Sequence, residues 1–182
     1  GVPTGLPAVG TYVRSSIADD GTVEVTQWIR STRPIGTVAL DAPPAPPAPP
    51  GATPVSATHV EAAAPGANVT RVASAAGSQR FDFDVPVRVV RLRYRLTGVL
   101  DRSPSLRGRA LARLVALDVH YAGRAGPTRV EVVGGVLAMA CAPAGLDDVS
   151  ARPCGGPGPG HWQVVLAGAE RDDRVMTQVD LG

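Results

Sequence analysis

The clearest alternation of apolar and polar positions along this chain lies within residues 81–100. In the second half of this stretch, four apolar residues alternate with three arginines: Val90, Leu92, Tyr94 and Leu96 against Arg91, Arg93 and Arg95. Successive side chains of a β-strand point to opposite faces, so the pattern predicts a strand with one apolar and one cationic face. A helix would scatter the arginines around its circumference. We therefore take this stretch as the central strand of the fold.

The first half of the same stretch is less regular, because Val87 and Val89 fall on the arginine side of the alternation. Either a bulge near Val89 and Val90 switches the faces, or this half is covered on both sides. Pro86 cannot donate a hydrogen bond to a neighbouring strand, so it marks a strand start or an edge strand.

Two shorter alternating runs near the N-terminus, residues 11–17 and 22–30, predict a β-hairpin. The sequence Asp19-Asp20-Gly21 between them is typical of a turn. In the second run Trp28 falls on the polar face, where it is either covered by another layer or exposed for binding. We expect it to be covered. Residues 35–41 predict a third, separate strand.

Further runs bounded by turn residues predict strands at residues 55–63, 67–74, 115–121, 128–141, 161–167 and 175–181. The 128–141 run carries Gly134-Gly135, where we expect a kink. Residues 106–114 fit either a helix or a strand, and their odd–even alternation favours the strand. Strands recur without the helices that parallel crossovers need. The pattern predicts one all-β domain over residues 1–182, an antiparallel β-sandwich or a partly open barrel with little helix.

Residues 42–54, APPAPPAPPGATP, interrupt this pattern between the N-terminal hairpin region and the main strand system. A segment so rich in proline favours the extended polyproline II conformation and cannot form a strand ladder. It predicts a long loop or spacer, or else a ligand for a groove-type recognition domain. The 41 residues before it are too few for a core of their own, so we expect them to pack on the rest of the chain.

The amino-acid composition indicates the source of the chain and gives its net charge. All 18 basic residues are arginine, and Ala, Gly, Pro and Val are abundant, which is typical of a bacterial chain from a GC-rich genome. The formal net charge of +2 does not by itself indicate a polyanionic partner. No apolar run is long enough to span a membrane. The chain shows no signal peptide, which fits a processed protein from which a signal or an anchor was removed.

The two cysteines, Cys141 and Cys154, predict one disulfide in a loop-rich chain. A disulfide indicates an oxidising compartment, so we expect an extracytoplasmic location, secreted or exposed on the cell envelope. The alternatives are two free thiols, or a mixed cysteine and histidine metal site that includes His161. Neither Cys-x-x-Cys nor His-x-x-x-His spacing occurs, so we predict no metal and no cofactor.

No catalytic motif is present: the sequence has no Gly-x-Ser-x-Gly elbow and no phosphate-binding loop. The leading hypothesis is a non-enzymatic interaction or structural domain of a bacterial envelope or secreted protein. Its partner would be another envelope protein or a cell-wall polymer. The alternative is a hydrolase with His120 or His161 as its base. A third hypothesis is polyanion binding, although the lack of aromatics on the cationic face argues against nucleic acid. The arginines of that candidate surface are Arg88, Arg91, Arg93 and Arg95. We favour the alternative for this row, a solvated sheet face whose arginines pair with Asp or Glu on neighbouring strands.

Overall fold

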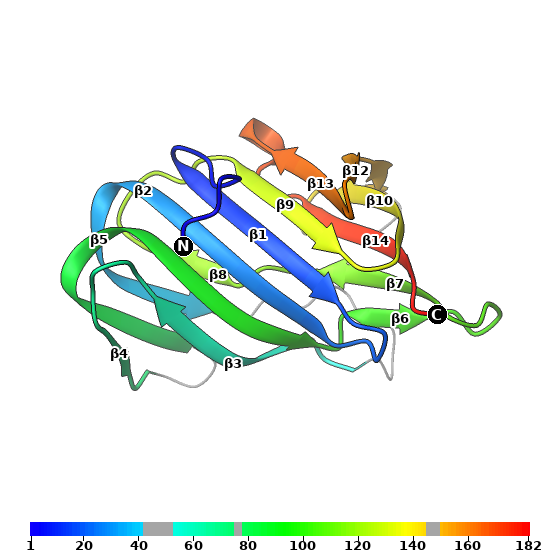
Figure 1. Ribbon diagram of the computed structural model, residues 1–182, viewed down its shortest axis with the longest axis horizontal. Helices are drawn as coiled ribbons and strands as arrows, with labels where there is room; N and C mark the ends of the chain where they lie inside the picture. The colour runs from blue at the N-terminus through cyan, green and yellow to red at the C-terminus, as the bar shows by residue number, and fades with distance from the viewer. Residues whose placement is uncertain (42–52, 75–77, 145–149) are drawn as a thin grey trace.

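The computed structural model describes residues 1–41, 53–74, 78–144 and 150–182. These residues form two β-sheets that pack face to face (Figure 1), and the described helix is limited to short 3-10 turns such as η2 (Gly168–Glu170). The predicted all-β, sandwich-like class is confirmed. No helix in the described part of the chain has the length and the apolar character to cross a bilayer.

The larger sheet has nine strands, and seven of them form its main path. β4 (Val69–Val72) joins this path by pairing with β5, and β8 (Asp118–His120) joins it by pairing with β2. All pairings are antiparallel except that of β1 with β9, which is parallel. The main path runs β12 (Gly156–Gly158), β13 (His161–Leu166), β9 (Thr128–Val133), β1 (Gly10–Ile17), β2 (Val23–Asp41), β5 (Ser78–Thr97) and β3 (Ser56–Ala63).

The smaller sheet has five strands and lies behind the larger one in Figure 1. Every pairing in it is antiparallel. Its strand order is β11 (Arg152–Pro153), β10 (Val136–Ala142), β14 (Arg174–Asp180), β7 (Arg109–Leu114) and β6 (Leu100–Arg102).

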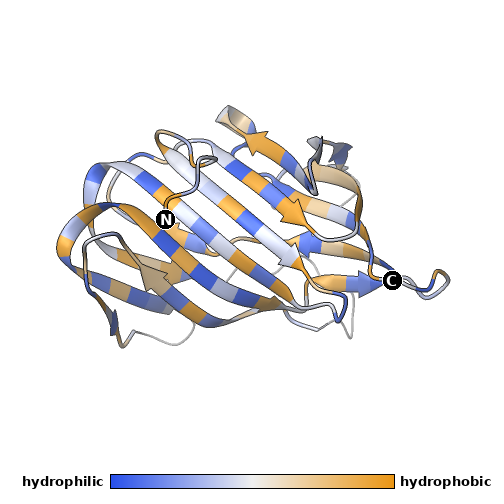
Figure 2. Ribbon diagram, in the orientation of Figure 1, coloured by the Kyte–Doolittle hydropathy of each residue, from blue (hydrophilic) through white to orange (hydrophobic). Residues whose placement is uncertain are grey.

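The core lies between the two sheets. We call the face that each sheet turns toward the other its inner face, and the opposite face its outer face. Val90, Leu92 and Leu96 of β5 are completely buried on the inner face, as the alternation predicted. Burying one such side chain contributes about 1.5–3 kcal/mol. Figure 2 shows the same alternation of apolar and polar positions along the neighbouring strands of this sheet.

The irregular half of β5 is explained by a register shift against β2. Val87 pairs with Ile35 whereas Val89 pairs with Arg30, so β2 has extra residues at this point. Val87 and Val90 are both buried, three positions apart, and the buried face therefore switches between them. The structure supports the bulge rather than a strand covered on both sides. It also corrects our division of β2, because residues 22–30 and 35–41 belong to one strand.

Two stretches of continuous alternation pass from one sheet to the other. Residues 128–141 divide into β9 in the larger sheet and β10 in the smaller sheet, at Gly134-Gly135. Residues 109–121 divide in the same way into β7 and β8, with no strand at residues 115–117. The expected strand over 115–121 is therefore wrong in its first half, whereas the preference for strand over helix is confirmed for Arg109–Leu114.

The predicted disulfide is confirmed: Cys141 of β10 is bonded to Cys154, with their Cα atoms 5.7 Å apart. Cys141 is completely buried. Between the runs 128–141 and 161–167, where the sequence predicted no strand, the structure has the short strands β11 and β12. Of the proline-rich segment expected at residues 42–54, residues 42–52 lie outside the described residues.

Candidate functional site

The outer face of β5 carries the predicted row of arginines. β5 lies between β2 and β3, so each arginine has a neighbour on both sides. Arg91 lies between Trp28 and Ala63, and Arg93 between Thr26 and Glu61. We call Arg91, Arg93, Arg95 and Trp28 the arginine surface.

The three arginines of this row differ in their partners. Arg95 forms an ion pair with Glu24, with 2.9 Å between its Nη2 and the carboxylate. Among the described residues Arg91 and Arg93 form no ion pair, although Glu61 lies opposite Arg93 in the strand register. Like charges on adjacent positions of one face repel unless partners or ligands neutralise them. The structure therefore leaves two cations available at the centre of this face.

Arg88, the fourth arginine of the predicted surface, lies apart from the other three. It is at the register shift between β2 and β5, where its guanidinium donates a hydrogen bond to the backbone carbonyl of Thr32. Its role is therefore to tie the two strands together at the bulge.

Trp28 forms the floor of a small hollow next to Arg91. The indole ring is half-buried and stacks on Tyr12, with the ring centroids 5.3 Å apart and the planes at 15°. The sequence predicted a Trp28 that is either covered by another layer or exposed for binding, and we expected it to be covered. In the structure it is partly covered. The hollow has a volume of about 320 Å³, and its other lining residues are mainly apolar: Gly1, Val2, Ala63, Ala64, Pro65 and Val89. We call it the Trp28 hollow.

Tyr12 lies on the outer face but is buried, because residues 1–9 cross this face of the sheet. Pro7 accepts a hydrogen bond from Arg30 there, at 3.3 Å. The Tyr12 hydroxyl donates a hydrogen bond of 2.5 Å to Glu131, a carboxylate that is itself only 7% exposed. Arg129 stacks over the Tyr12 ring at 5.5 Å. Together these contacts hold the floor of the Trp28 hollow in place.

Burial, reinforced by the hydrogen bond to Glu131, raises the pKa of Tyr12 to about 12. We expect Tyr12→Phe to lower the free energy of unfolding by about 1–3 kcal/mol at pH 7, because the Glu131 carboxylate loses a donor. The pKa of an unfolded tyrosine is about 10, so this stabilisation is complete below pH 10 and is lost as pH rises toward 12. Urea unfolding at pH 7, 9 and 11 measures the free energy of unfolding of both proteins. The difference between the unmodified protein and Tyr12→Phe should decrease above pH 10. A difference that is constant with pH would contradict the raised pKa of Tyr12.

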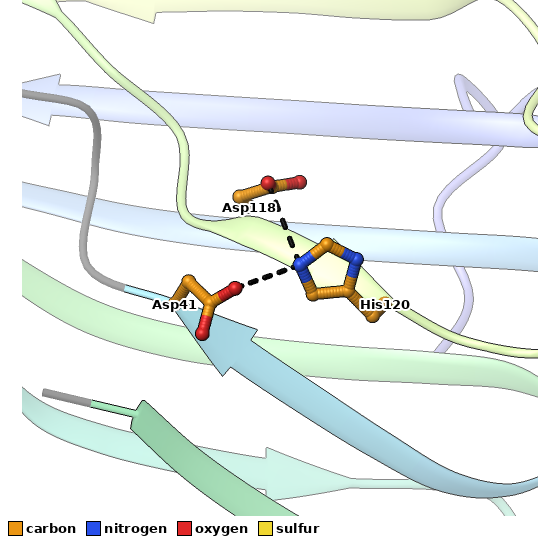
Figure 3. A group of neighbouring side chains, drawn as sticks. All are labelled: Asp41, Asp118 and His120. Carbon is orange, nitrogen blue, oxygen red and sulfur yellow. Dashed lines mark hydrogen bonds and ion pairs between the residues drawn. The ribbon is translucent and has the colours of Figure 1, made fainter. Parts of the chain in front are cut away.

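A second group of functional side chains forms where β8 pairs with β2. Asp41 lies directly opposite Asp118, and His120 is two residues further along β8. Figure 3 shows the His120 ring between the two carboxylates, with its Nε2 2.8 Å from Asp41 and 3.5 Å from Asp118. Their ligand atoms lie within 4.8 Å of one another, close enough to share a metal ion. All three side chains are more than half exposed, however, so the group is equally explained as a surface ion-pair cluster that joins the strands.

The structure places both histidines of the hydrolase hypothesis, His120 and His161, outside the cavity between the sheets. A cavity of about 330 Å³ lies between the sheets and is lined by Ser15 and Asp118, but by no histidine of the described chain. His120 is outside it, at the surface. The Nδ1 of His161 donates a hydrogen bond to the Pro159 carbonyl oxygen at 2.8 Å. The sequence could not reveal the Asp41–Asp118–His120 group, because it depends on the pairing of two strands far apart in the chain.

Comparison with known proteins yields a similarity of fold. No protein-family model matches the chain, and no curated protein matches its sequence. Among solved structures, the chain resembles an aminopeptidase N family protein from Idiomarina loihiensis, with a TM-score of 0.51 and 12% identity over 93% of this chain and 29% of that one. An M1 zinc metallopeptidase from Deinococcus radiodurans aligns with a TM-score of 0.41 and 15% identity, over 93% and 41%. The chain thus shares its fold with a segment covering less than a third of the first protein.

Proposed function

We propose that this chain is a non-enzymatic interaction domain of a bacterial extracytoplasmic protein, and that it binds another protein through the arginine surface. One observation carries the proposal: Arg91 and Arg93 have no ion pair among the described residues, and Arg91 lines the apolar Trp28 hollow. Arginine and tryptophan are enriched among the residues that contribute most to protein–protein binding. The disulfide supports the extracytoplasmic setting.

The chemistry of the surface favours an acidic partner with an apolar side chain. Carboxylates of the partner would neutralise Arg91 and Arg93, and a leucine or an aromatic ring would fill the Trp28 hollow. A cell-wall polymer or another uniform polyanion fits less well. Such a polymer has no apolar side chain, so it would leave the Trp28 hollow empty.

The comparison with solved structures supports a role as one domain of a larger protein, since the similar segment is a fraction of an aminopeptidase N family protein. It does not transfer the activity of that protein to this chain. The sequence contains no His-Glu-x-x-His run, with which many zinc peptidases bind their metal. These observations favour a domain that binds a partner over a domain that catalyses a reaction.

Charge reversal at the centre of the surface tests the proposal. The probe is a synthetic peptide in which Glu and Asp flank a Leu-Phe pair, and its binding is measured by isothermal titration calorimetry. We expect Arg93→Glu to weaken binding about 10–100-fold, because an attractive contact becomes a repulsive one. The matched control is Arg107→Glu, an exposed arginine in the turn between β6 and β7, which should bind as the unmodified protein does.

Two further titrations separate the possible partners. A peptide with the same acids but with Ala in place of Leu-Phe should bind more weakly, because it leaves the Trp28 hollow empty. Heparin, a uniform polyanion, should also bind more weakly than the Leu-Phe peptide. If heparin binds better than the peptide, the polyanion hypothesis replaces this one. If Arg93→Glu and Arg107→Glu weaken peptide binding equally, the binding depends on the net charge of the protein and not on the arginine surface.

A further inference from the structure

The inter-sheet cavity, defined above by its volume of about 330 Å³, is separate from the arginine surface. It lies against the inner face of the larger sheet, and residues of both sheets line it. Val13, Ile29 and Val130 come from the larger sheet, whereas Leu114 and Val175 come from the smaller one. All five are at least nine-tenths buried. The volume falls within the range of small-molecule sites, which is roughly 300–1,000 Å³.

Of the polar residues that line this cavity, which also include Thr11, Thr128 and Tyr121, two are almost completely buried on its inner wall. Ser15 of β1 is 2% exposed and Gln27 of β2 is 4% exposed, and both line the cavity. The register places them diagonally on one face, since Ser15 pairs with Val25 and Gln27 pairs with Val13. Burying a polar group without a hydrogen bond is costly, so such groups are expected to have partners.

Only part of this hydrogen-bonding capacity is used within the protein. Tyr94 donates to the Gln27 Oε1 at 3.0 Å, and the Leu117 backbone N–H donates to the Tyr94 hydroxyl at 3.1 Å. These bonds fix the Gln27 amide with its oxygen occupied. Within the described residues, neither the Gln27 Nε2 nor the Ser15 hydroxyl has a hydrogen-bond partner. Two donors therefore remain at diagonal positions on the inner wall of the cavity.

The charged residues around the cavity exclude an anionic ligand from its interior. Asp118 and Asp172 are exposed, and Arg171 pairs with Asp172 at the surface. The side chain of Asp173 is 5% exposed, but Arg152 already binds it at 2.8 Å. Arg174 also lines the cavity, but it already has an interaction partner. A ligand carboxylate at Ser15 and Gln27 would thus lack an unpaired cation.

We propose that the inter-sheet cavity binds a compact, uncharged, apolar molecule that carries one carbonyl group. The carbonyl oxygen accepts hydrogen bonds from the Gln27 amide and the Ser15 hydroxyl, and the apolar body contacts Val13, Ile29 and Val130. This assignment satisfies both free donors and fills the apolar space with one molecule.

Acetophenone is the probe, because it joins a carbonyl to a compact apolar ring. We expect the methyl signals of Val13, Ile29 and Val130 to shift in ¹H–¹³C NMR spectra, with a Kd on the order of 1 mM. The methyls of Val165, which is 62% exposed on the outer face, should not shift. Toluene, which lacks the carbonyl, should bind more weakly, and benzoate, which is charged, should not bind.

Two variants assign the binding to this cavity. Ser15→Ala removes one donor and should weaken acetophenone binding about three- to tenfold while leaving toluene unchanged. Ala116→Phe fills the cavity from the connection between β7 and β8, which has no strand pairing to disturb, and should abolish both. The methyl spectrum of each variant shows whether it is folded.

Three results would overturn the proposal. Absence of methyl shifts at millimolar acetophenone would mean that the cavity holds only water. Binding of benzoate or toluene as tight as that of acetophenone would contradict the uncharged carbonyl class. Binding that is insensitive to both Ser15→Ala and Ala116→Phe would place the site elsewhere.

Discussion

Gly135→Ala is expected to lower the free energy of unfolding by about 3–4 kcal/mol, the largest effect of any single substitution we consider. Gly135 has a positive φ of 28°, and a Cβ atom built there would lie 2.0 Å from the backbone oxygen of Asp180. The contact cannot be relieved by a side chain, because Asp180 belongs to β14 and donates a backbone hydrogen bond to Gly135 at 2.8 Å. The new methyl group would force β14 away from the point where the chain changes sheets.

The control for this substitution is Gly66→Ala. Gly66 also has a positive φ, of 75°, but nothing lies within 4 Å of a Cβ built there. It should cost only the backbone penalty, about 1–2 kcal/mol. Guanidinium unfolding of both variants measures the difference. A loss at Gly135 no larger than that at Gly66 would mean that the two sheets meet less closely than the structure indicates.

Replacing both Cys141 and Cys154 with alanine is expected to cause the second largest loss of stability. The disulfide closes a short loop, and its removal is expected to cost about 3 kcal/mol, mainly by freeing the unfolded chain. For a chain of this size that corresponds to a decrease in Tm of about 6–12 °C. The bond also ties β10 to the segment before β12, where the Cys154 N–H donates to the Met139 carbonyl at 3.2 Å.

A reducing agent separates the effect of losing the disulfide bond from the effect of replacing the cysteine side chains. Dithiothreitol should lower the Tm of the unmodified protein toward that of the double variant, and it should leave the double variant unchanged. Alkylation of the denatured, unreduced protein should find no free thiol. Two free thiols, or a double variant as stable as the unmodified protein, would remove the main support for an extracytoplasmic setting.

The sequence predicted the strands of this fold better than their assignment to sheets. Alternation along residues 90–96 identified the inner and outer faces of β5 correctly, because only a strand separates arginine from leucine at every second position. Alternation continues unchanged, however, when a chain leaves one sheet and enters another. Residues 128–141 therefore appeared as one strand, although Gly134-Gly135 marked the crossing as a kink. Residues 115–117 cross without glycine and gave no signal.

Pairings between strands that are distant in the chain could not be predicted from the sequence. The parallel pairing of β1 with β9 joins strands more than a hundred residues apart, and no local pattern encodes it. The same holds for the candidate sites. The row of Arg91, Arg93 and Arg95 follows from one strand and was predicted, whereas its contact with Trp28 requires the register of β2 against β5. The Asp41–Asp118–His120 group likewise requires β8 to pair with β2.

We propose that this domain functions through the outer face of its larger sheet. A ¹⁵N NMR titration of the protein with the acidic Leu-Phe peptide, following every assigned backbone amide, tests this proposal. We expect chemical-shift changes concentrated at Trp28, Arg91 and Arg93, with little change at His120 or Ser15. Shifts centred on the Asp41–Asp118–His120 group or on the inter-sheet cavity, or no shifts at all, would contradict it.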